Sequence, residues 1–395
     1  MPMPRTIKRL LVANRGEIAI RVMRAANELG IRTIAVYADE DKLALHRFKA
    51  DESYLIGQGH GPVRAYLAIP EMLRIAALAG ADAVHPGYGF LSENPDFADA
   101  VIAAGLTWVG PRPETMRLLG NKVAAREAAQ AAGVPMVPAS GPLPEDANEA
   151  AGPVAEIGYP VMLKASWGGG GRGMRRVDEA ADLERELTAA RREAESAFGN
   201  GEIYAERFVA RARHVEVQLL GDDHGNIVHL FERDCSVQRR NQKIVERAPA
   251  PYLDDDSRET LCQSALALGR FASYRGAGTV EFLMDADDGG TYFIEVNPHV
   301  QVEHTVTEEV TGIDIVKAQL LIAQGGVIGE ASSGVPPQSE IHLNGHALQC
   351  RITTEDPEAN FIPDYGRITA YRGATGFGIR LDGGTAYSGA VITRY

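Results

Sequence analysis

Cysteine and positive charge are both scarce in this sequence of 395 residues. The three cysteines, Cys235, Cys262 and Cys350, are widely spaced and form neither a paired nor a metal-ligand pattern. Their spacing gives no support for a zinc site and favours a reducing compartment. The net charge of −13 argues against nucleic acid as a partner, because phosphate backbones are held by an excess of lysine and arginine. Any anionic ligand must therefore bind at a local basic cluster.

Long apolar runs are absent as well. No apolar stretch reaches the roughly 18 residues that a membrane-spanning helix needs, and residues 1–8 lead directly into a strand-like run. We therefore expect no membrane segment and a cytoplasmic location. A hydrophobic content of 45% in a chain of this length is enough for two or three domains, each with its own core.

The first 120 residues predict an open parallel sheet with helices on both faces. An apolar run at Leu10–Ala13 is followed by apolar residues at helical spacing from Ile18 to Leu29 and by a second apolar run at Ile34–Tyr37. This strand, helix and strand form a βαβ unit. Helix-like segments leading into Ala81–His85 and Leu106–Val109 repeat the pattern, which is typical of an α/β domain.

The composition changes after residue 120. Prolines and glycines between Gly133 and Pro144 favour turns and a hinge over packed elements. A strand at Val161–Ala165, a glycine loop, a strand at Met174–Val177 and a charged helix over residues 179–197 then predict a small lid. From Tyr204 onward, strand-like runs separated by turn signals predict an antiparallel sheet and an α+β domain.

These changes predict four segments along the chain. We expect an N-terminal α/β domain at residues 1–120, a linker helix and hinge at 121–140, and a lid at 141–204. Residues 205–395 then form the C-terminal domain with its antiparallel sheet.

The glycine loop is the most conspicuous local motif. Gly168, Gly170 and Gly173 satisfy a GxGxxG pattern, but the loop lies between two strand-like runs rather than between a strand and a helix. This context excludes a dinucleotide fingerprint. A glycine-rich hairpin still lets backbone N–H groups approach phosphate, and Lys164 on the preceding strand could bind the same anion. A flexible surface loop is the alternative that the pattern leaves open.

A second group of polar residues predicts a metal site. Glu281 and Glu295 each lie near the end of a strand-like run, and alternation places Asn297 on the same face as Glu295. Two carboxylates and an amide oxygen are hard ligands of the kind that magnesium requires when it bridges ATP phosphates. Solvated strand residues are the alternative for any single glutamate.

Two further groups carry candidate chemistry. Glu303 and His304 could supply a general base or an acid/base pair, although such a pair is often structural. A basic stretch in this otherwise acidic chain is unusually rich in polar neighbours, although a solvated face is the usual explanation of such a run. Its basic residues are Arg233, Arg239, Arg240, Lys243 and Arg247.

Taken together, these stretches resemble the biotin carboxylase family of ATP-grasp enzymes over the whole chain. The segments that carry the resemblance are Val12–Ala19, His85–Asn94, the glycine loop, Glu232–Arg240 and Phe293–His304. Leu343–Arg351, with the segments that follow up to Gly366, resembles the pyruvate carboxylase branch rather than the acyl-CoA carboxylases. The resemblance implies an N-terminal pre-ATP-grasp domain, an ATP-grasp lid and an antiparallel C-terminal ATP-grasp catalytic domain.

The resemblance also implies a reaction, namely the ATP-dependent carboxylation of biotin by bicarbonate through carboxyphosphate. It requires ATP, Mg²⁺ or Mn²⁺, and biotin supplied by a carrier domain or protein. By resemblance, Glu303 is the base that deprotonates bicarbonate and Arg351 is the cation that stabilises the biotin enolate. The residues that match ATP-binding positions are Lys122, Lys164, Gly168, Gly169, Gly170, Gly171, Glu206 and Gln238; those at metal positions are Glu281, Glu295 and Asn297; those at bicarbonate and biotin positions are Lys243, His299, Gln301, Val302, Arg351 and Tyr88.

The chain departs from the family pattern at one catalytic position. Family members have Asn-Pro-Arg where this chain reads Asn297-Pro298-His299. An imidazole has an ordinary pKa of about 6.5, and Lys243 and Arg351 as neighbours should favour its neutral form. We therefore expect the bicarbonate site to lack one permanent cation.

The chain also ends at Tyr395, where family members continue for several dozen residues. It contains no biotin-bearing Met-Lys-Met segment and no carboxyltransferase domain. We therefore expect a C-terminal domain truncated at its end, with a biotinyl carrier domain and a carboxyltransferase domain in the same or a partner chain, and a homo-oligomer. The alternatives are the biotin carboxylase subunit of an acetyl-CoA or propionyl-CoA carboxylase and a non-catalytic ATP-binding regulatory protein.

Overall fold

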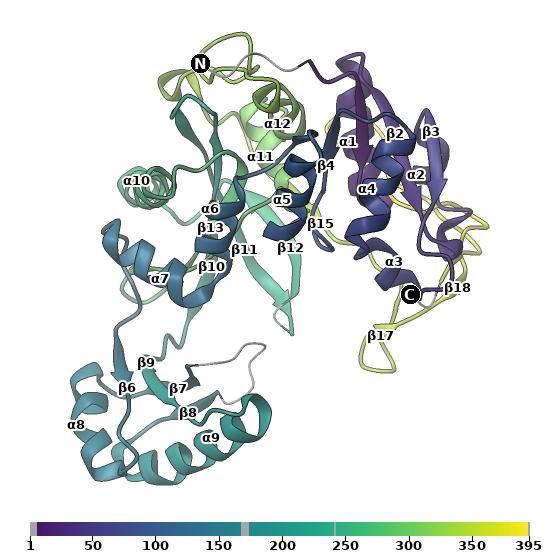
Figure 1. The fold of residues 1–395 in the computed structure, drawn as a ribbon. Coiled ribbons are helices and arrows are strands. Elements are labelled where there is room, and N and C mark those ends of the chain that lie inside the picture. The colour runs from purple at the N-terminus through teal and green to yellow at the C-terminus, as the bar shows by residue number, and fades with distance from the viewer. Residues whose placement is uncertain (1–5, 167–173, 241, 394–395) are drawn as a thin grey trace. The chain divides into compact units, whose positions relative to one another are not determined.

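The computed structural model describes residues 6–166, 174–240 and 242–393 (Figure 1). The chain forms two compact units. The larger comprises Met1–Val134, His214–Phe282 and Ile294–Tyr395, and the smaller comprises Pro135–Arg213 and Leu283–Phe293. Compactness alone does not decide domain limits, so the boundaries predicted at residues 120, 140 and 204 stay predictions.

A five-stranded parallel sheet begins the larger unit, in the order β3-β2-β1-β4-β5. Leu10 and Leu11 of the central strand β1 are both fully buried, which shows that both faces of the sheet are covered. The predicted parallel sheet is confirmed. Its strands are β1 (Arg9–Val12), β2 (Arg32–Tyr37), β3 (Glu52–Leu55), β4 (Ala83–His85) and β5 (Thr107–Trp108).

The helices around this sheet follow the predicted periodicity. In α1, Ile18, Val22 and Ala25 lie on the buried face, and the side chain of Asn94 caps the first turn of α5 by accepting from two backbone N–H groups. The helices are α1 (Gly16–Glu28), α2 (Leu45–Lys49), α3 (Pro62–Tyr66), α4 (Ile69–Leu78), α5 (Pro95–Ala103), α6 (Pro113–Gly120) and α7 (Lys122–Ala131), with a 3₁₀ turn η1 (Asp39–Asp41). The short elements β3, α2 and α3 lack a periodic signal long enough to predict.

The smaller unit is built on a four-stranded sheet in the order β6-β9-β7-β8. Its neighbouring strands are antiparallel, and Val161, Leu163 and Leu187 belong to its core. The predicted strand at Val161–Ala165 is confirmed as β7. The other elements are β6 (Ala139–Pro142), α8 (Ala147–Ile157), β8 (Arg175–Val177), η2 (Ala180–Asp182), α9 (Leu183–Phe198) and β9 (Ile203–Arg207).

The prediction of turns and a hinge between Gly133 and Pro144 is wrong for Ala139–Pro142. These residues form β6, an edge strand that pairs with β9. An edge strand tolerates proline because one side of its backbone needs no ladder hydrogen bonds. The hydroxyl of Ser140 also accepts a hydrogen bond from the backbone of Ala205, which secures the pairing.

A six-stranded sheet follows in the order β14-β13-β10-β11-β12-β15. The pairs β10–β11, β11–β12 and β12–β15 are antiparallel, as predicted. Helix α10 had no counterpart in the sequence prediction. The strands are β10 (Ala212–Gly221), β11 (Ile227–Arg239), β12 (Gln242–Ala248), β13 (Gly276–Asp285), β14 (Thr291–Asn297) and β15 (Ala347–Cys350), and the helices are α10 (Asp255–Phe271), α11 (His304–Thr311) and α12 (Ile315–Ala323).

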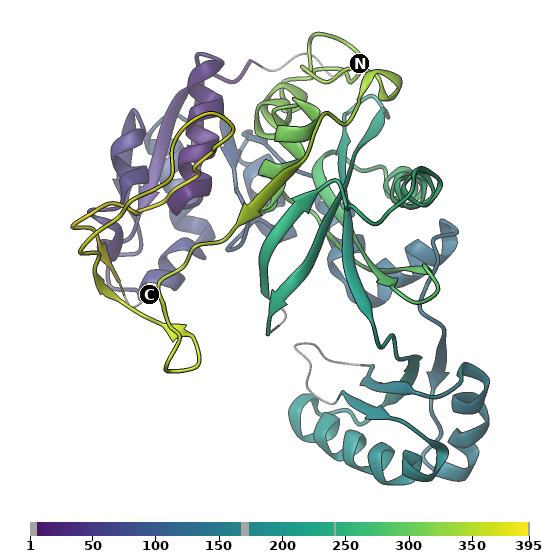
Figure 2. The ribbon, with the colours of Figure 1, turned by 180° about the vertical axis from the view of Figure 1, so that it is seen from behind.

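The C-terminal segment lies along the N-terminal part of the larger unit. Figures 1 and 2 both show this yellow segment crossing the purple helices. Asp382 lies 3.7 Å from Arg24 of α1, and Arg380 donates to Glu308 of α11 at 2.8 Å. The short elements here are η3 (Gln338–Glu340), β16 (Glu355–Asp356), β17 (Ile362–Pro363), β18 (Gly366–Arg367) and β19 (Val391–Ile392). Within the described part of the chain, no helix has both the length and the hydropathy to cross a bilayer.

The fold predicts an acid sensitivity at His85. Its ring is fully buried at the end of β4, where burial lowers the pKa to about 4. The unfolded chain, with an ordinary histidine pKa of about 6.5, binds a proton that the folded chain does not. The free energy of unfolding should therefore fall as the pH drops from about 6.5 to 4, by up to about 1.4 kcal/mol per pH unit.

Urea unfolding of the wild type and of His85→Gln at several pH values measures this effect. We expect a shallower pH dependence in His85→Gln, whatever its stability at neutral pH. His60, which is exposed, provides the control His60→Gln with an unchanged slope. Equal slopes for the wild type and His85→Gln would contradict the assignment.

Candidate active site

The turn that carries Tyr88 is fixed by residues at the end of the parallel strands. Asn14, after β1, donates from Nδ2 to the carbonyls of Pro86 and Tyr88, each at 2.7 Å. His85 Nδ1 accepts from the backbone N–H of Gly87 at 3.0 Å. Gly87 has φ +66°, and a Cβ there would lie 2.8 Å from Asn14 Nδ2, so glycine is required. The turn therefore holds Tyr88 at the carboxyl edge of the sheet, where ligands of such sheets bind.

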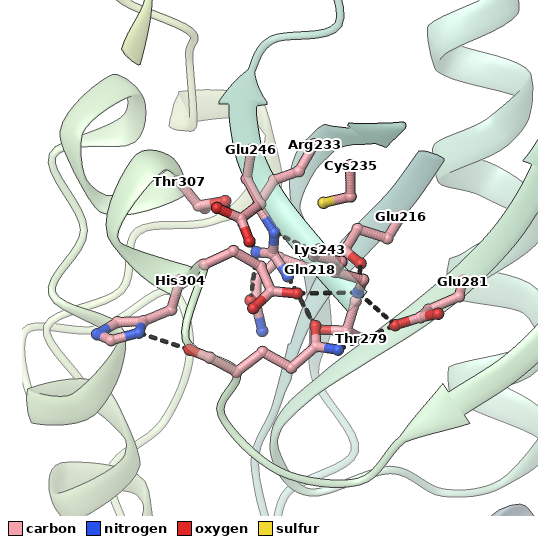
Figure 3. Close-up of polar contacts among 12 residues, drawn as sticks. Glu216, Gln218, Arg233, Cys235, Lys243, Glu246, Thr279, Glu281, His304 and Thr307 are labelled. Atoms are coloured by element: carbon pink, nitrogen blue, oxygen red, sulfur yellow. Dashed lines mark hydrogen bonds and ion pairs between the residues drawn. The ribbon is translucent and has the colours of Figure 1, made fainter. Parts of the chain in front are cut away.

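Arg233 of β11 is fully buried, and all five of its side-chain N–H groups have acceptors. Figure 3 shows its guanidinium among residues from several elements. A buried arginine is tolerated only when its charge is paired and each donor is satisfied. The acceptors are Glu216 at 2.7 Å, Gln218 at 2.7 Å, Thr307 at 3.0 Å, Gln301 at 3.0 Å and Thr279 at 3.1 Å.

Lys243 of β12 lies within reach of three carboxylates. Its ammonium donates to Glu216 at 2.5 Å and to Glu281 at 2.6 Å (Figure 3). It also donates to Glu303 at 2.9 Å. Burial alone would lower the pKa of Lys243, but Glu216, Glu303 and Glu281 outweigh it and raise that pKa. Lys243 is therefore held in its charged form beside the base predicted from the sequence.

Glu303 lies between two cations. It is 2% exposed, and its Oε1 accepts from Lys243 while its Oε2 accepts from Arg351 Nη2 at 2.9 Å. Arg351 in turn donates from Nε to the buried carboxylate of Glu246 at 2.6 Å. Both oxygens of Glu303 are therefore in ion pairs, and an incoming anion would compete with Glu303 for the two cations.

His214 completes the charge balance of this cluster. The buried carboxylates Glu216, Glu246, Glu281 and Glu303 outnumber the cations Arg233, Lys243 and Arg351 by one. His214 Nε2 lies 3.0 Å from Glu281 and 3.6 Å from Glu216. Burial would lower the pKa of His214, but these two carboxylates raise it to about 9. The imidazole is therefore charged at pH 7, and the cluster is neutral.

Of the three predicted metal ligands, Glu281 lies in the middle of β13, whereas Glu295 and Asn297 lie near the end of β14. Asn297 Nδ2 donates to Glu281 Oε1 at 2.7 Å, which leaves the amide oxygen of Asn297 available. Burial and the negative charge of Glu281 raise the pKa of Glu295. Two hard carboxylates that repel each other beside an amide oxygen fit a divalent cation such as magnesium.

Two other clusters of potential metal ligands exist among the described residues. One comprises His214, Glu216 and Glu281, and the other comprises Glu216, Cys235 and Glu303. Both contain Glu216, whose pKa is lowered by Lys243 and Arg233 although burial opposes the shift. Because protein cations already neutralise this carboxylate, we interpret both clusters as parts of the ion-pair network.

His299 has a partner that the sequence did not indicate. Its Nε2 lies 2.8 Å from Glu93 Oε1, and its Nδ1 lies 2.8 Å from the carbonyl of Val300. The expectation of a neutral ring beside Lys243 and Arg351 did not include Glu93 as a neighbour, and it stays a prediction.

The predicted ATP-binding residues lie in both units. In the smaller unit, Lys164 of β7 pairs with Glu206 of the adjacent strand β9. In the larger unit, Lys122 at the start of α7 lies 3.8 Å from Glu295, and Gln238 of β11 donates to the carbonyl of Cys235 at 3.0 Å. The loop glycines Gly168, Gly169, Gly170 and Gly171 lie outside the described residues. The ATP-binding roles of all these residues stay predictions.

Gln301 connects the remaining predicted residues to the cluster. Its Nε2 donates to Glu281 at 3.0 Å, and its Oε1 accepts from Arg233. Val302 is the next residue and leads into Glu303. These two hydrogen bonds of Gln301 therefore hold the loop that carries Val302, a predicted bicarbonate contact, and Glu303, the predicted base.

Several residues of this cluster were missed in the sequence. His214, Glu216 and Gln218 alternate with valines in β10, and this spacing places all three on one face of the strand. A buried strand with polar residues at every second position was a usable signal. Glu246 gave no comparable signal, because its partner Arg351 lies 105 positions along the chain.

The chain matches two family models and several known proteins. Residues 6–116 match the biotin carboxylase N-terminal domain, and residues 121–331 match the ATP-binding domain of the carbamoyl-phosphate synthase L chain. Pyruvate carboxylase 1 of Caenorhabditis elegans is 53% identical over 99% of this chain, and pyruvate carboxylase of Staphylococcus aureus is 53% identical over 98%. The chain spans about a third of the length of these curated relatives, 33% and 34% respectively.

Solved structures give the same result. Rhizobium etli pyruvate carboxylase T882A with acetyl coenzyme A superposes with a TM-score of 0.88 and 66% identity, covering 99% of this chain and 35% of that chain. The biotin carboxylase domain of a thermophilic 2-oxoglutarate carboxylase bound to bicarbonate gives a TM-score of 0.92 and 43% identity. In that case the match covers 99% of this chain and 84% of the other.

The buried guanidinium predicts a strong effect of Arg233→Lys. Lysine offers three donors and no planar fork, so acceptors in the cluster lose their partners. We expect the free energy of unfolding to fall by about 3–5 kcal/mol, as when one partner of a buried ion pair is removed. Urea unfolding measures it, with Arg117→Lys at an exposed pair with Asp96 and Asp99 as the control that changes little. An unchanged midpoint for Arg233→Lys would contradict the role of the five hydrogen bonds.

Proposed function

The chain belongs to the biotin carboxylase family, and we propose that it carboxylates biotin with MgATP and bicarbonate as the N-terminal part of a pyruvate carboxylase. As in its family, the reaction is that of a ligase, which joins the carbon of bicarbonate to a ureido nitrogen of biotin while ATP is cleaved. The observation that carries the proposal is the position of Glu303 between Lys243 and Arg351.

The ion pairs of Glu303 indicate how bicarbonate binds. An anion that enters beside Lys243 and Arg351 competes with Glu303 for the same N–H donors. Once it has taken over one cation, a Glu303 oxygen is free to accept the proton of bicarbonate. Lys243, with its raised pKa, keeps its proton throughout and stabilises the anion that forms. Gln301 and the backbone of Val302 complete this pocket.

The remaining roles follow by position. Glu281, Glu295 and Asn297 would hold magnesium, which reduces the negative charge of the ATP phosphates when bound. We assign ATP binding to Lys122, Lys164, Glu206, Gln238 and the glycines at 168–171, because they match the ATP-binding positions of the family. Arg351 faces the ureido oxygen of biotin, beside Tyr88, and stabilises the negative charge that develops there.

The curated relatives are about three times as long as this chain. We propose a biotinyl carrier domain and a carboxyltransferase domain in the same or a partner chain, and a homo-oligomer. The identity to pyruvate carboxylases supports pyruvate as the final acceptor over acetyl-CoA or propionyl-CoA. The complete set of ion pairs around Glu303 favours a catalyst over a regulatory ATP-binding protein. The cytoplasm stays a prediction, because the rat and human relatives are named as mitochondrial.

We predict that Glu303→Gln leaves the affinity for ATP near normal but removes bicarbonate-dependent ATP cleavage. The amide keeps the shape of the side chain but cannot accept the proton, and general-base catalysis is worth about 10²- to 10⁴-fold. ATP cleavage with bicarbonate and free biotin measures it. Glu309→Gln, at an exposed position of α11, the helix that follows Glu303, is the control and should keep full activity. A Glu303→Gln variant with more than about a tenth of the activity would point to another base.

We predict that His299→Arg lowers the bicarbonate concentration needed for half-maximal ATP cleavage. An arginine restores a permanent charge and a planar fork, and a charge-assisted pair is worth about 1.5–3 kcal/mol, or about tenfold to a hundredfold in affinity. Titration of bicarbonate at saturating ATP and biotin measures the change, and the affinity for ATP should not move. If both proteins saturate at the same bicarbonate concentration, another residue already replaces the missing cation.

A further inference from the structure

Arg351 is held by two contacts outside the regular part of its sheet. It follows the last residue of β15, and residues 351–354 have no regular structure. Its backbone N–H donates to the carbonyl of Ile244 at 2.9 Å. Its Nε donates to Glu246 Oε1 at 2.6 Å, and Glu246 lies on β12 opposite Gln349 of β15. The side chain of Arg351 therefore depends on Glu246 for its direction.

Glu246 differs from Glu303 in what surrounds it. It is fully buried, and its other oxygen accepts from Gln349 at 3.3 Å. Burial raises the pKa of Glu246 and Arg351 opposes that rise, so its ionised form is favoured by the same guanidinium that it holds. In the proposed reaction, Glu303 gives up one of its ion pairs to the incoming anion. Glu246 keeps its ion pair with Arg351 throughout.

The guanidinium of Arg351 donates to two carboxylates, Glu246 and Glu303. Nε is bonded to Glu246 and Nη2 to Glu303, and neither bond uses Nη1. When substrate takes the place of Glu303, the bond from Nε is the side-chain contact that still fixes the plane of the guanidinium. The planar guanidinium of an arginine binds an acceptor most strongly when its orientation is already fixed before the acceptor arrives.

We propose that Glu246 is a positioning residue, which keeps the guanidinium of Arg351 aimed at Glu303 and at the ureido oxygen of biotin. This inference rests on the proposed function, since it assigns Arg351 to the biotin step. It predicts that loss of Glu246 impairs the biotin-dependent step and leaves ATP binding intact.

A second buried pair provides a matched control. Glu232 of β11 is also fully buried and accepts from Nε of an arginine, Arg258 of α10, at 3.1 Å. The other donors of Arg258 bond to Asp255 and to the carbonyl of Leu253, so these hydrogen bonds reach no residue of the candidate site. Glu232→Gln removes the same charge from the same kind of pair away from the candidate site.

The kinetic experiment compares Glu246→Gln, Glu246→Asp and Glu232→Gln with the wild type in ATP cleavage with bicarbonate, with and without free biotin. For Glu246→Gln we expect the biotin-dependent kcat to fall about tenfold to a hundredfold, the size of effect that misplacing a catalytic group produces. Its KM for ATP should stay within about twofold of the wild type. Glu246→Asp keeps the charge but shortens its reach, and should recover part of the loss. Glu232→Gln should keep wild-type kinetics even if it is less stable.

A structural readout separates the inference from the proposed function. In ¹⁵N NMR spectra, the Nε–H signal of Arg351, identified by its absence in Arg351→Lys, should shift in Glu246→Gln and Glu246→Asp but not in Glu232→Gln. A wild-type chain without biotin-stimulated ATP cleavage would overturn the proposed function. The positioning of Arg351 is overturned if Nε–H does not shift, or if a folded Glu246 variant retains wild-type biotin kinetics. Should Glu246→Gln fail to fold, Glu246→Asp decides by the same two measurements.

Discussion

The buried guanidinium of Arg233 is the constraint on which the candidate site depends. With no access to water, it needs an acceptor for each of five N–H groups. Those acceptors come from β10, β13, α11 and the loop before α11, so satisfying one side chain sets the register between the sheet and the loop. The position of Glu303 thus follows from a residue that itself contacts no predicted substrate.

Beyond Arg233, the charges alternate along one continuous path. Glu216 bonds to both Arg233 and Lys243, and Glu303 bonds to both Lys243 and Arg351, after which Glu246 ends the series. Each charge between the two ends of the series therefore has an opposite charge on either side, which offsets the cost of removing it from water. An incoming anion would compete with Glu303 at the point where the two cations Lys243 and Arg351 converge.

Much of the fold could be predicted because its signals are local. The apolar spacing in α1 and the runs of β1, β2 and β7 lie within short windows, and the family motifs named Lys243, Glu281 and Glu303 directly. Contacts that decide the cluster's geometry are instead distant in sequence. Glu246 meets Arg351 and His299 meets Glu93 across 105 and 206 positions, and no window of sequence contains both partners. Only the alternating polar residues of β10 gave a local signal that went unused.

The pairing of His299 with Glu93 places more of the anion-binding task on the remaining cations. With both ring nitrogens facing protein oxygens, His299 has no donor left for a substrate unless one of those contacts breaks. Lys243 and Arg351 must then both neutralise Glu303 and capture the incoming anion. Two cations that share these tasks have to be fixed accurately, because neither can rely on a third donor to correct its direction. Glu216 bonds to Lys243 and Glu246 bonds to Arg351, so these two carboxylates fix the direction of the cations. Because residue 299 is a histidine, this fixing matters more here than in a chain with a third permanent cation.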